Sequence, residues 1–437
     1  MRSRRIIFLL FAFFPTVAGS QEVLSLQDAI RIGLDNSYAI QIARNNVEIA
    51  TNNNTFGNAG YLPNLGFNLN QSNNFQDRYQ ENADGTSVSA SGFPTYNLAS
   101  AVQLNWTLFD GFAMFVRKEK LGLLQEQSQQ MLRIEVKNTI ADIVYTYYSI
   151  VLHEKLFRSY NEQLSLSRQR LDVAREKSKI GVGFGLQELQ AEVDFRADSA
   201  QLVRQRNRVV NLKAELNMLL IRDPDVEFNI DMEIPVPLTV GADEVYEKIV
   251  SCNDALANAR IMSQIVELEL REAKSSRYPD VNLFSSYNFS RTGTPEGQMQ
   301  LYRTLGPTVG VGVSLSLFNG FNATRRISNA RILADNQRIN LESLSLKLKS
   351  SAFKMVNELN QAIELVRVEE KSASLALQNT EAAWERYRLG AISDLELRES
   401  QIKLLDAQTR LLQAQMNAQA AEIEIRSLTG EMEIYLQ

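Results

Sequence analysis

The sequence is poor in the residues that carry most catalytic and metal chemistry. Among its 437 residues are one cysteine, Cys252, and one histidine, His153. A single cysteine excludes an intrachain disulfide, and an isolated histidine is neither a convincing metal ligand nor a catalytic base. We expect Cys252 to be a small buried apolar residue and His153 to serve packing or the surface. With no nucleophile–base set and no phosphate loop in the sequence, we predict that the chain is not an enzyme and carries no cofactor or metal.

Long apolar runs are missing after the first twenty residues. Three arginines within the first five residues precede an apolar run over 6–14 and then Ala18-Gly19-Ser20, which is typical of a signal peptide over residues 1–20. Its removal would lower the formal net charge from −5 to −8, and such a chain gives no reason to expect nucleic-acid binding. No later stretch is long and apolar enough for a transmembrane helix, so any membrane crossing must use strands.

Proline and glycine are absent from Phe321 to Leu389, which predicts one helix on the order of 100 Å long. Gly390 breaks this helix, and Ser393 and Glu396 then have the spacing of a capping box. From Leu404 onward, apolar residues recur at alternating steps of three and four as far as Leu428, and many of them are alanine. This seam predicts a second, closely packed helix that returns along the first and ends at Gly430.

The same design occurs earlier in the chain. Leu108-Phe109-Asp110-Gly111-Phe112 matches Leu317-Phe318-Asn319-Gly320-Phe321, and Ile180-Gly181 matches Leu389-Gly390, both at an offset of 209 residues. A constant offset across so long a segment indicates a duplicated unit. We therefore predict a first repeat over 21–222, a proline-marked connector over 223–241 and a second repeat over 242–437. Each repeat would contain a helix, a β-hairpin and a long helical hairpin. The helix of the first repeat would run from Ser25 towards Gly60.

Two-residue alternation predicts four strands of about ten residues. Leu65, Phe67 and Leu69 start the first, and a polar stretch over 71–96 reads as a long loop before the second, which runs to Leu108. The second repeat alternates from Val281 to Phe289 and from Val309 to Leu317. Such alternation fits lipid-facing barrel strands, although an ordinary soluble sheet remains the alternative. Four strands cannot close a barrel in lipid, so the chain must oligomerise: two copies would supply eight strands and three would supply twelve.

These features together resemble the outer-membrane efflux protein family, the TolC-like ducts of Gram-negative bacteria. The resemblance rests on Leu24-Ser25-Leu26-Gln27-Asp28-Ala29-Ile30, Tyr61-Leu62-Pro63-Asn64-Leu65, the two Leu-Phe-x-Gly-Phe motifs and Tyr387-Arg388-Leu389-Gly390. It implies a mainly α fold with a small β part. Three copies would form a twelve-stranded β-barrel in the outer membrane, continued by an α-helical barrel across the periplasm.

The resemblance also implies a function and partners. Such a homotrimer would sit in outer-membrane lipid and serve as the exit duct of a tripartite efflux or type I secretion system. It would dock onto a periplasmic adaptor protein and an inner-membrane pump of the RND, ABC or MFS type, without nucleic acid. The alternative that the residues leave open is a secreted coiled-coil scaffold or adhesin without a pore.

The family pattern assigns roles to residues at the helical tips. By the match on Gly390, the resemblance implies a pore gate and a set of adaptor-docking positions. From the residues alone, Glu396 reads equally well as a helix cap, and the glycines read first as turn formers. The implied gate consists of Tyr387, Glu396 and Glu399, with Gln187 and Gln190 in the first repeat. The implied docking positions are Gly181, Gly183, Gly185, Leu186, Gly390, Ser393 and Leu395.

Overall fold

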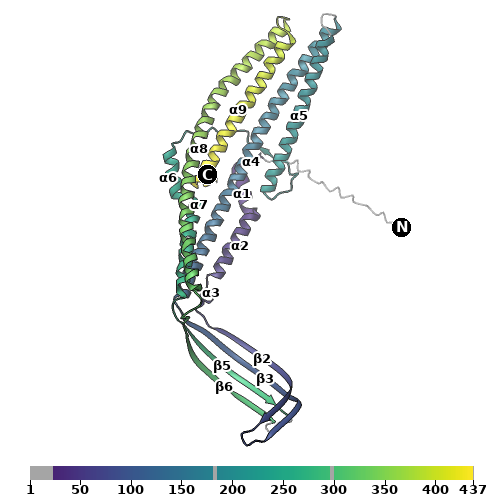
Figure 1. Ribbon diagram of the computed structural model, residues 1–437. Coiled ribbons are helices and arrows are strands. Elements are labelled where there is room, and N and C mark those ends of the chain that lie inside the picture. The colour runs from purple at the N-terminus through teal and green to yellow at the C-terminus, as the bar shows by residue number, and fades with distance from the viewer. Residues whose placement is uncertain (1–22, 181–184, 296–299, 437) are drawn as a thin grey trace, which may run out of the picture. The chain divides into compact units, whose positions relative to one another are not determined.

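The computed structural model describes residues 23–180, 185–295 and 300–436 (Figure 1). The expected signal peptide over 1–20, Gly181 and Gly183 lie outside the described residues. The chain forms two compact units: one holds residues up to 38, 136–249 and 351 onward, and the other holds 39–135 and 250–350. In chain order the elements are β1 (Val23–Leu24), α1 (Leu26–Asn36), α2 (Tyr38–Asn53), α3 (Phe56–Ala59), β2 (Asn64–Glu81), β3 (Ser87–Asp110), α4 (Ala113–Lys179), α5 (Gly185–Leu219), β4 (Asn229–Ile230), α6 (Ala242–Cys252), α7 (Asp254–Ser275), β5 (Asp280–Gly293), β6 (Leu301–Ser314), α8 (Asn322–Arg388), α9 (Asp394–Thr429) and η1 (Met432–Leu436).

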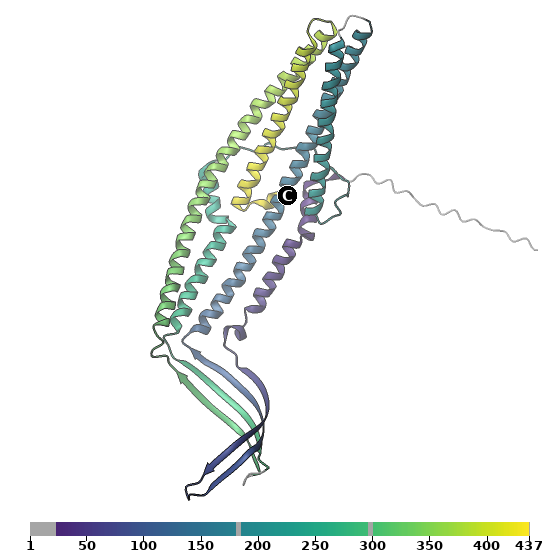
Figure 2. The same ribbon diagram turned by 45° about the vertical axis from the view of Figure 1, so that its right-hand side comes forward.

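The expected long helices are confirmed. Helices α4 and α8 each contain 67 residues, and both their starts and their ends keep the offset of 209 seen in the sequence. Figures 1 and 2 both show α5 returning beside α4 and α9 returning beside α8. The seam of α9 packs as the heptad pattern predicts, because Leu404, Ala407, Ala414, Ala418, Ala421 and Ile425 are all buried.

The two Leu-Phe-x-Gly-Phe motifs build the same turn before each long helix. Gly111 and Phe112 have φ of 65° and 74°, and Gly320 and Phe321 have φ of 64° and 63°. In each turn the polar residue before the glycine caps the helix. The Asp110 carboxylate accepts a hydrogen bond from the Met114 N–H at 2.9 Å, and the Asn319 side-chain oxygen accepts one from the Ala323 N–H at 3.3 Å. At Gly111 the backbone of Ser275 also comes so close that a Cβ would lie 2.5 Å from its carbonyl oxygen. The repeated sequence therefore repeats a left-handed turn that aligns strand with helix.

A four-stranded antiparallel sheet has the order β2-β3-β5-β6, so the two hairpins of the repeats pair through β3 and β5. Strands β2 and β3 have 18 and 24 residues, and β5 and β6 have 14 each. The expected length of about ten residues is therefore too short. Strand β6 ends at Ser314, so the expected extension to Leu317 is wrong.

The expected long loop over 71–96 is also wrong, because backbone pairing continues from Gln71 opposite Leu98 to Glu81 opposite Ser87. Both faces of this extension are largely exposed, so it needs no apolar alternation to remain paired. A register shift lies between Gln76 and Arg78, and there the Asp77 carboxylate accepts from the Ser91 hydroxyl at 2.6 Å and the Gly92 N–H at 2.8 Å. This local polar contact holds the irregular pairing that the sequence pattern did not reveal.

The helix expected from Ser25 towards Gly60 is broken into α1, α2 and α3. Ser25 caps the first as predicted and accepts from the Asp28 N–H at 3.1 Å. A new cap at Thr55 accepts from the Asn58 N–H at 3.1 Å, and Gly60 ends the short α3 in the left-handed conformation. Asparagine and threonine side chains compete for backbone hydrogen bonds, which explains why the polar stretch near Thr55 interrupts the helix.

The largest apolar core lies in the unit that contains the parallel β1–β4 pair. Its fully buried side chains include Ile30, Ile140, Ile143, Leu216 and Met432, contributed by α1, α4, α5 and η1. Cys252, in contrast, is exposed, so the expectation that it is buried is wrong. None of the described helices combines the length and apolar character needed to cross a membrane.

Candidate functional site

The turn between α8 and α9 shows why the sequence breaks at Gly390. This glycine has φ of 73°, and the Ala391 N–H reaches back to the Arg386 carbonyl at 2.9 Å. Ser393 then caps α9: its hydroxyl accepts from the Glu396 N–H at 3.3 Å, and the Glu396 carboxylate accepts from the Ser393 N–H at 3.3 Å. The predicted capping box is confirmed, and it fixes the direction in which α9 leaves the turn.

Large apolar side chains project from both tips. The exposed fraction is 75% for Leu186 at the start of α5, 83% for Leu389 and 76% for Leu395. Gly185 is the first residue of α5, so the described part of the first tip also begins with a small residue. Exposed leucines at the ends of two helical hairpins are the kind of surface that another helical protein can cover.

The expected gate carboxylates lie on the exposed face of the first turns of α9, and both have local partners. Glu396 belongs to the capping box, and Glu399 pairs with Lys403 at 2.7 Å on the same helix. Hydrogen bonding to Lys403 and its positive charge lower the pKa of Glu399, so this carboxylate is ionised at neutral pH. In the first repeat Gln187 and Gln190 are exposed, and the Gln190 amide donates to Asp194 at 3.5 Å.

Tyr387 differs from the other expected gate residues because its side chain is buried within the protomer. The Lys177 ammonium lies 4.3 Å from the centre of its ring, and the Trp384 ring lies beside it with centroids 6.2 Å apart. Burial and the nearby Asp394 carboxylate raise the pKa of Tyr387 to about 12. In this conformation Tyr387 holds α8 against α4 and α9.

A buried ionic cluster, which sequence reasoning missed, joins three of the long helices just behind the tips. The Arg398 guanidinium binds both oxygens of Asp198, at 2.8 and 2.9 Å. Arg170, which is fully buried, pairs with Asp194 and lies 3.6 Å from Asp394. Arg170 lies on α4, Asp194 and Asp198 lie on α5, and Asp394 and Arg398 lie on α9. The cluster therefore ties the hairpin of the first repeat to the hairpin of the second.

One signal in the sequence could have found this cluster. At the offset of 209, Arg170 corresponds to Asn379, Asp198 to Ala407 and Arg398 to Leu189. A charged residue in one repeat that corresponds to an uncharged residue in the other departs from the internal symmetry. The three positions that depart in this way all belong to the cluster behind the tips. They identify positions where the two hairpins differ in role.

His153, the one histidine of the sequence, makes its contacts with α5. The Gln205 amide nitrogen donates a hydrogen bond to Nδ1 of His153 at 3.0 Å. This contact fits the packing role that we expected for His153. Burial and the nearby Arg208 lower the pKa of His153, which keeps the imidazole neutral at physiological pH. Within the described residues no cluster of histidine, cysteine or carboxylate side chains is arranged to hold a metal ion.

The architecture is similar to that of solved outer-membrane proteins. The outer membrane protein VceC from Vibrio cholerae matches with a TM-score of 0.74 at 15% identity, over 93% of this chain and 96% of that one. The outer-membrane channel OprN matches with a TM-score of 0.75 at 17% identity, over 93% of this chain and 90% of that one. At these identities the likeness establishes the fold alone, a mainly helical chain with a small β part.

Sequence comparison adds a family match over part of the chain. The family model described as "Outer membrane efflux protein" matches residues 245–431. The alkaline protease secretion protein AprF from Pseudomonas aeruginosa is 22% identical over 413 residues, covering 92% of this chain and 83% of AprF. The second half of the chain is therefore similar to the outer-membrane efflux protein family, and nearly the whole chain is similar to AprF.

Proposed function

We propose that this protein is the exit duct of a tripartite efflux or type I secretion system. It conducts passively from the periplasm through the outer membrane, where it resides with a large periplasmic portion. The observation that carries this function is the duplicated pair of 67-residue helices attached to a four-stranded sheet with two open edges. A scaffold or adhesin without a pore has no use for such a sheet.

The open edges support a trimer. Strands β2 and β6 are the edge strands, and their apolar side chains are 60–70% exposed: Leu65, Phe67 and Leu69 on β2, and Val309, Val311 and Val313 on β6. Unpaired backbone edges in lipid are too costly to persist, so β2 of one copy must pair with β6 of the next. Three copies supply twelve strands, which close a barrel wide enough for a conduit.

The tips support docking to a partner. Leu186, Leu389 and Leu395 present exposed apolar side chains beside Gly185 and Gly390, where small residues allow close approach. We assign these positions, with Ser393 and the tip residues Gly181 and Gly183, to contact with a periplasmic adaptor. The adaptor would in turn connect the duct to an inner-membrane pump of the RND, ABC or MFS type.

Membrane fractionation and cross-linking test this function together. The full-length protein should be recovered in the outer-membrane fraction, and chemical cross-linking in detergent should yield trimers. A stable, monodisperse monomer in detergent would refute the barrel. A protein found only in soluble periplasmic or extracellular fractions would favour the scaffold.

Docking has its own test. Leu395→Asp should abolish co-purification with the adaptor encoded beside the gene while the trimer still assembles. Ile402→Asp offers a matched control, because Ile402 is also an exposed apolar residue of α9 but lies farther from the tip. Loss of co-purification in both variants, or in neither, would contradict docking at the tip.

A further inference from the structure

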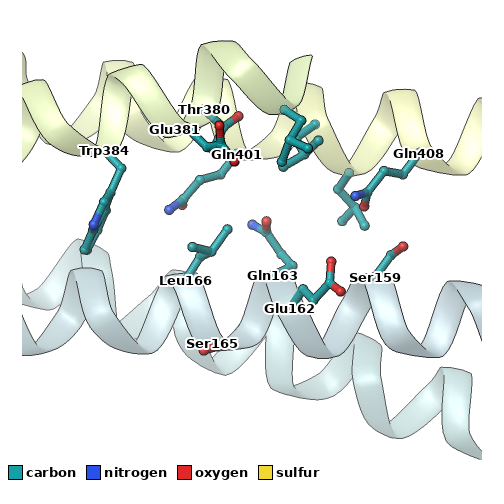
Figure 3. Close-up of a pocket in the computed structure, with 13 residues that line it drawn as sticks. Ser159, Glu162, Gln163, Ser165, Leu166, Thr380, Glu381, Trp384, Gln401 and Gln408 are labelled. Carbon is teal, nitrogen blue, oxygen red and sulfur yellow. The ribbon is translucent and has the colours of Figure 1, made fainter. Parts of the chain in front are cut away.

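A pocket of about 350 Å³ lies behind the tips, between α4 on one side and the α8–α9 hairpin on the other (Figure 3). Its walls are mostly apolar and carry a few polar and acidic side chains. Six of its residues matter here: Glu162 and Gln163 on α4, Glu381 and Trp384 on α8, and Gln401 and Leu404 on α9. In Figure 3 Trp384 spans one end of the space, while the amides of Gln163 and Gln401 extend into it from opposite sides.

Both side chains are buried, and three of their four amide oxygen and nitrogen atoms lack a hydrogen-bond partner among the described residues. Gln401 is fully buried and Gln163 is 4% exposed. Among the described residues neither oxygen nor nitrogen of the Gln401 amide has a hydrogen-bond partner, and the same is true of the Gln163 nitrogen. A buried polar group without a hydrogen bond costs about 1–3 kcal/mol, so ordinary helix packing gives no reason to place two amides here. They are donors and acceptors directed at the pocket.

The charge of the pocket has one sign. Glu162 and Glu381 supply two carboxylates, and no lysine or arginine is among the residues that line it. Neither carboxylate makes an ion pair within the part of the chain that the structure describes. Trp384 adds an aromatic face, and tryptophan binds cations better than the other aromatic side chains. Carboxylates, an indole and apolar walls together favour a ligand with positive charge and apolar surface.

We propose that this pocket binds an amphipathic organic ammonium ion. Its apolar part would lie against Leu404 and its neighbours, its cationic group between Trp384 and the two carboxylates, and its polar substituents against the amides of Gln163 and Gln401. The volume lies within the range of small-molecule sites. This site goes beyond conduction, because a bound ligand would touch both hairpins of a protomer. It would resist any movement of α4 away from α8 and α9.

Trp384 gives the site its own spectroscopic signal. The chain has two tryptophans, so Trp106→Phe leaves Trp384 as the only indole. The probe is benzyltrimethylammonium, titrated into the full-length trimer in a non-ionic detergent. Saturable quenching of Trp384 fluorescence is expected, with a dissociation constant on the order of 1 mM for a ligand of this size. N-acetyltryptophanamide under the same conditions corrects for collisional quenching.

Three comparisons make the test specific. Glu162→Gln with Glu381→Gln should weaken binding about ten-fold. Glu385→Gln, on the same helix, should leave binding unchanged, because Glu385 does not line the pocket and is paired with Arg388. Neopentylbenzene, which has the shape of the probe without its charge, should bind at least about five-fold more weakly.

Gln401→Leu separates binding from packing. It should raise the melting temperature, because an unpaired buried amide is removed. It should also weaken binding of (4-hydroxybenzyl)trimethylammonium, whose hydroxyl can hydrogen-bond the amide, more than binding of the probe, which has no such group. Absence of saturable quenching would overturn the proposal. So would equal binding of the neutral isostere, or equal effects of the pocket and control glutamate substitutions.

Discussion

Glu396 and Glu399 each have a local role besides the one expected at a pore. The first closes a capping box and the second is paired with Lys403, so part of the negative charge at each tip is already balanced. In a trimer each position occurs three times around the axis. Unbalanced like charges within a Debye length of about 8 Å attract cations, and the lysines reduce this effect. If the two glutamates line a pore, we therefore expect its cation preference to depend chiefly on Glu396.

Glu396→Gln with Glu399→Gln should reduce the cation preference of the duct while the trimer stays intact. Glutamine can still fill part of the capping role, so the melting temperature should fall only slightly. The reversal potential in a salt gradient measures the preference. If the reversal potential stays the same and the melting temperature falls, these glutamates cap a helix and do not line the pore. Glu424→Gln, an exposed acid far from the tip, is the control.

The ionic cluster predicts a large difference between two arginines of α9. Arg398→Ala leaves Asp198, which is 8% exposed, without its bidentate partner, and should destabilise the protomer by about 3–5 kcal/mol. Arg410→Ala removes a single pair between an exposed arginine and the half-buried Glu369, and should cost about 1 kcal/mol, because only one ion pair is lost and the arginine is solvated. Thermal unfolding of the two variants gives the comparison. Equal shifts would show that the cluster adds no more than a surface pair.

At the scale of elements, an ion pair between α4 and α7 predicts a pH effect. Burial raises the pKa of Glu272, but Lys120 at 2.6 Å and Arg117 at 3.4 Å outweigh it and lower the pKa below the ordinary 4.5. The folded state therefore favours the ionised form. The ionised Glu272 carboxylate stabilises the fold fully above pH about 4.5, and this stabilisation is lost as the pH falls through the pKa of Glu272 in the folded state.

Glu272→Gln should consequently lower the melting temperature at pH 7, and its effect should shrink as the pH falls from 4.5 through the folded pKa, where the wild-type carboxyl takes up a proton. Glu119→Gln is the matched control, because its contact with Arg271 is long, at 3.9 Å, and exposed. A difference between wild type and Glu272→Gln that stays constant from pH 7 to pH 3 would contradict the assignment.

Two glycines of the long hairpins predict opposite effects of the same substitution. Gly390→Ala places a Cβ on a left-handed residue and should cost about 1–2 kcal/mol. Gly122→Ala lies within α4 and should stabilise that helix by about 0.5–1 kcal/mol. A Cβ at either position meets no atom within 4 Å, so backbone conformation alone decides the sign. Melting temperatures that move in the same direction would refute this reading of the turn.

The elements that the sequence predicts well are those with local causes. Helix α8 follows from the absence of glycine and proline, α4 follows from the repeat at an offset of 209 residues, and the capping box at Ser393 follows from residues adjacent in the chain. The elements it predicts poorly depend on distant partners. The polar extension of β2 and β3 forms because the two strands pair with each other through their backbones. Neither strand shows an alternation of apolar and polar residues there that would predict the pairing.

The candidate site divides in the same way. The exposure of Leu186 and Leu395 at the tips is what turn sequences imply, whereas the burial of Tyr387 and the cluster of Arg170 and Arg398 require three helices to meet. Charges on one helix indicate a solvated face until a second helix supplies the partner. Only the packing of the first hairpin against the second reveals that these charges are buried.

The molecule as a whole carries the central claim, that three copies form a conduit. Four strands with exposed apolar side chains and two open edges are incomplete alone, and the long hairpins are repeated within each chain. Pairing of β2 with β6 between copies would close a barrel embedded in lipid. The helical hairpins of the three chains would enclose the continuation of the barrel's lumen outside the membrane. A scaffold built from the same helices would require neither closure nor a lumen.

The current through single copies of the assembly in a planar bilayer tests this claim most directly. Trimers purified in detergent should insert and produce discrete, reproducible conductance steps, with a preference for cations. Protein from the same preparation that has been dissociated to monomers should produce none. Trimers that insert into the bilayer but give no conductance steps at any applied potential would contradict the account.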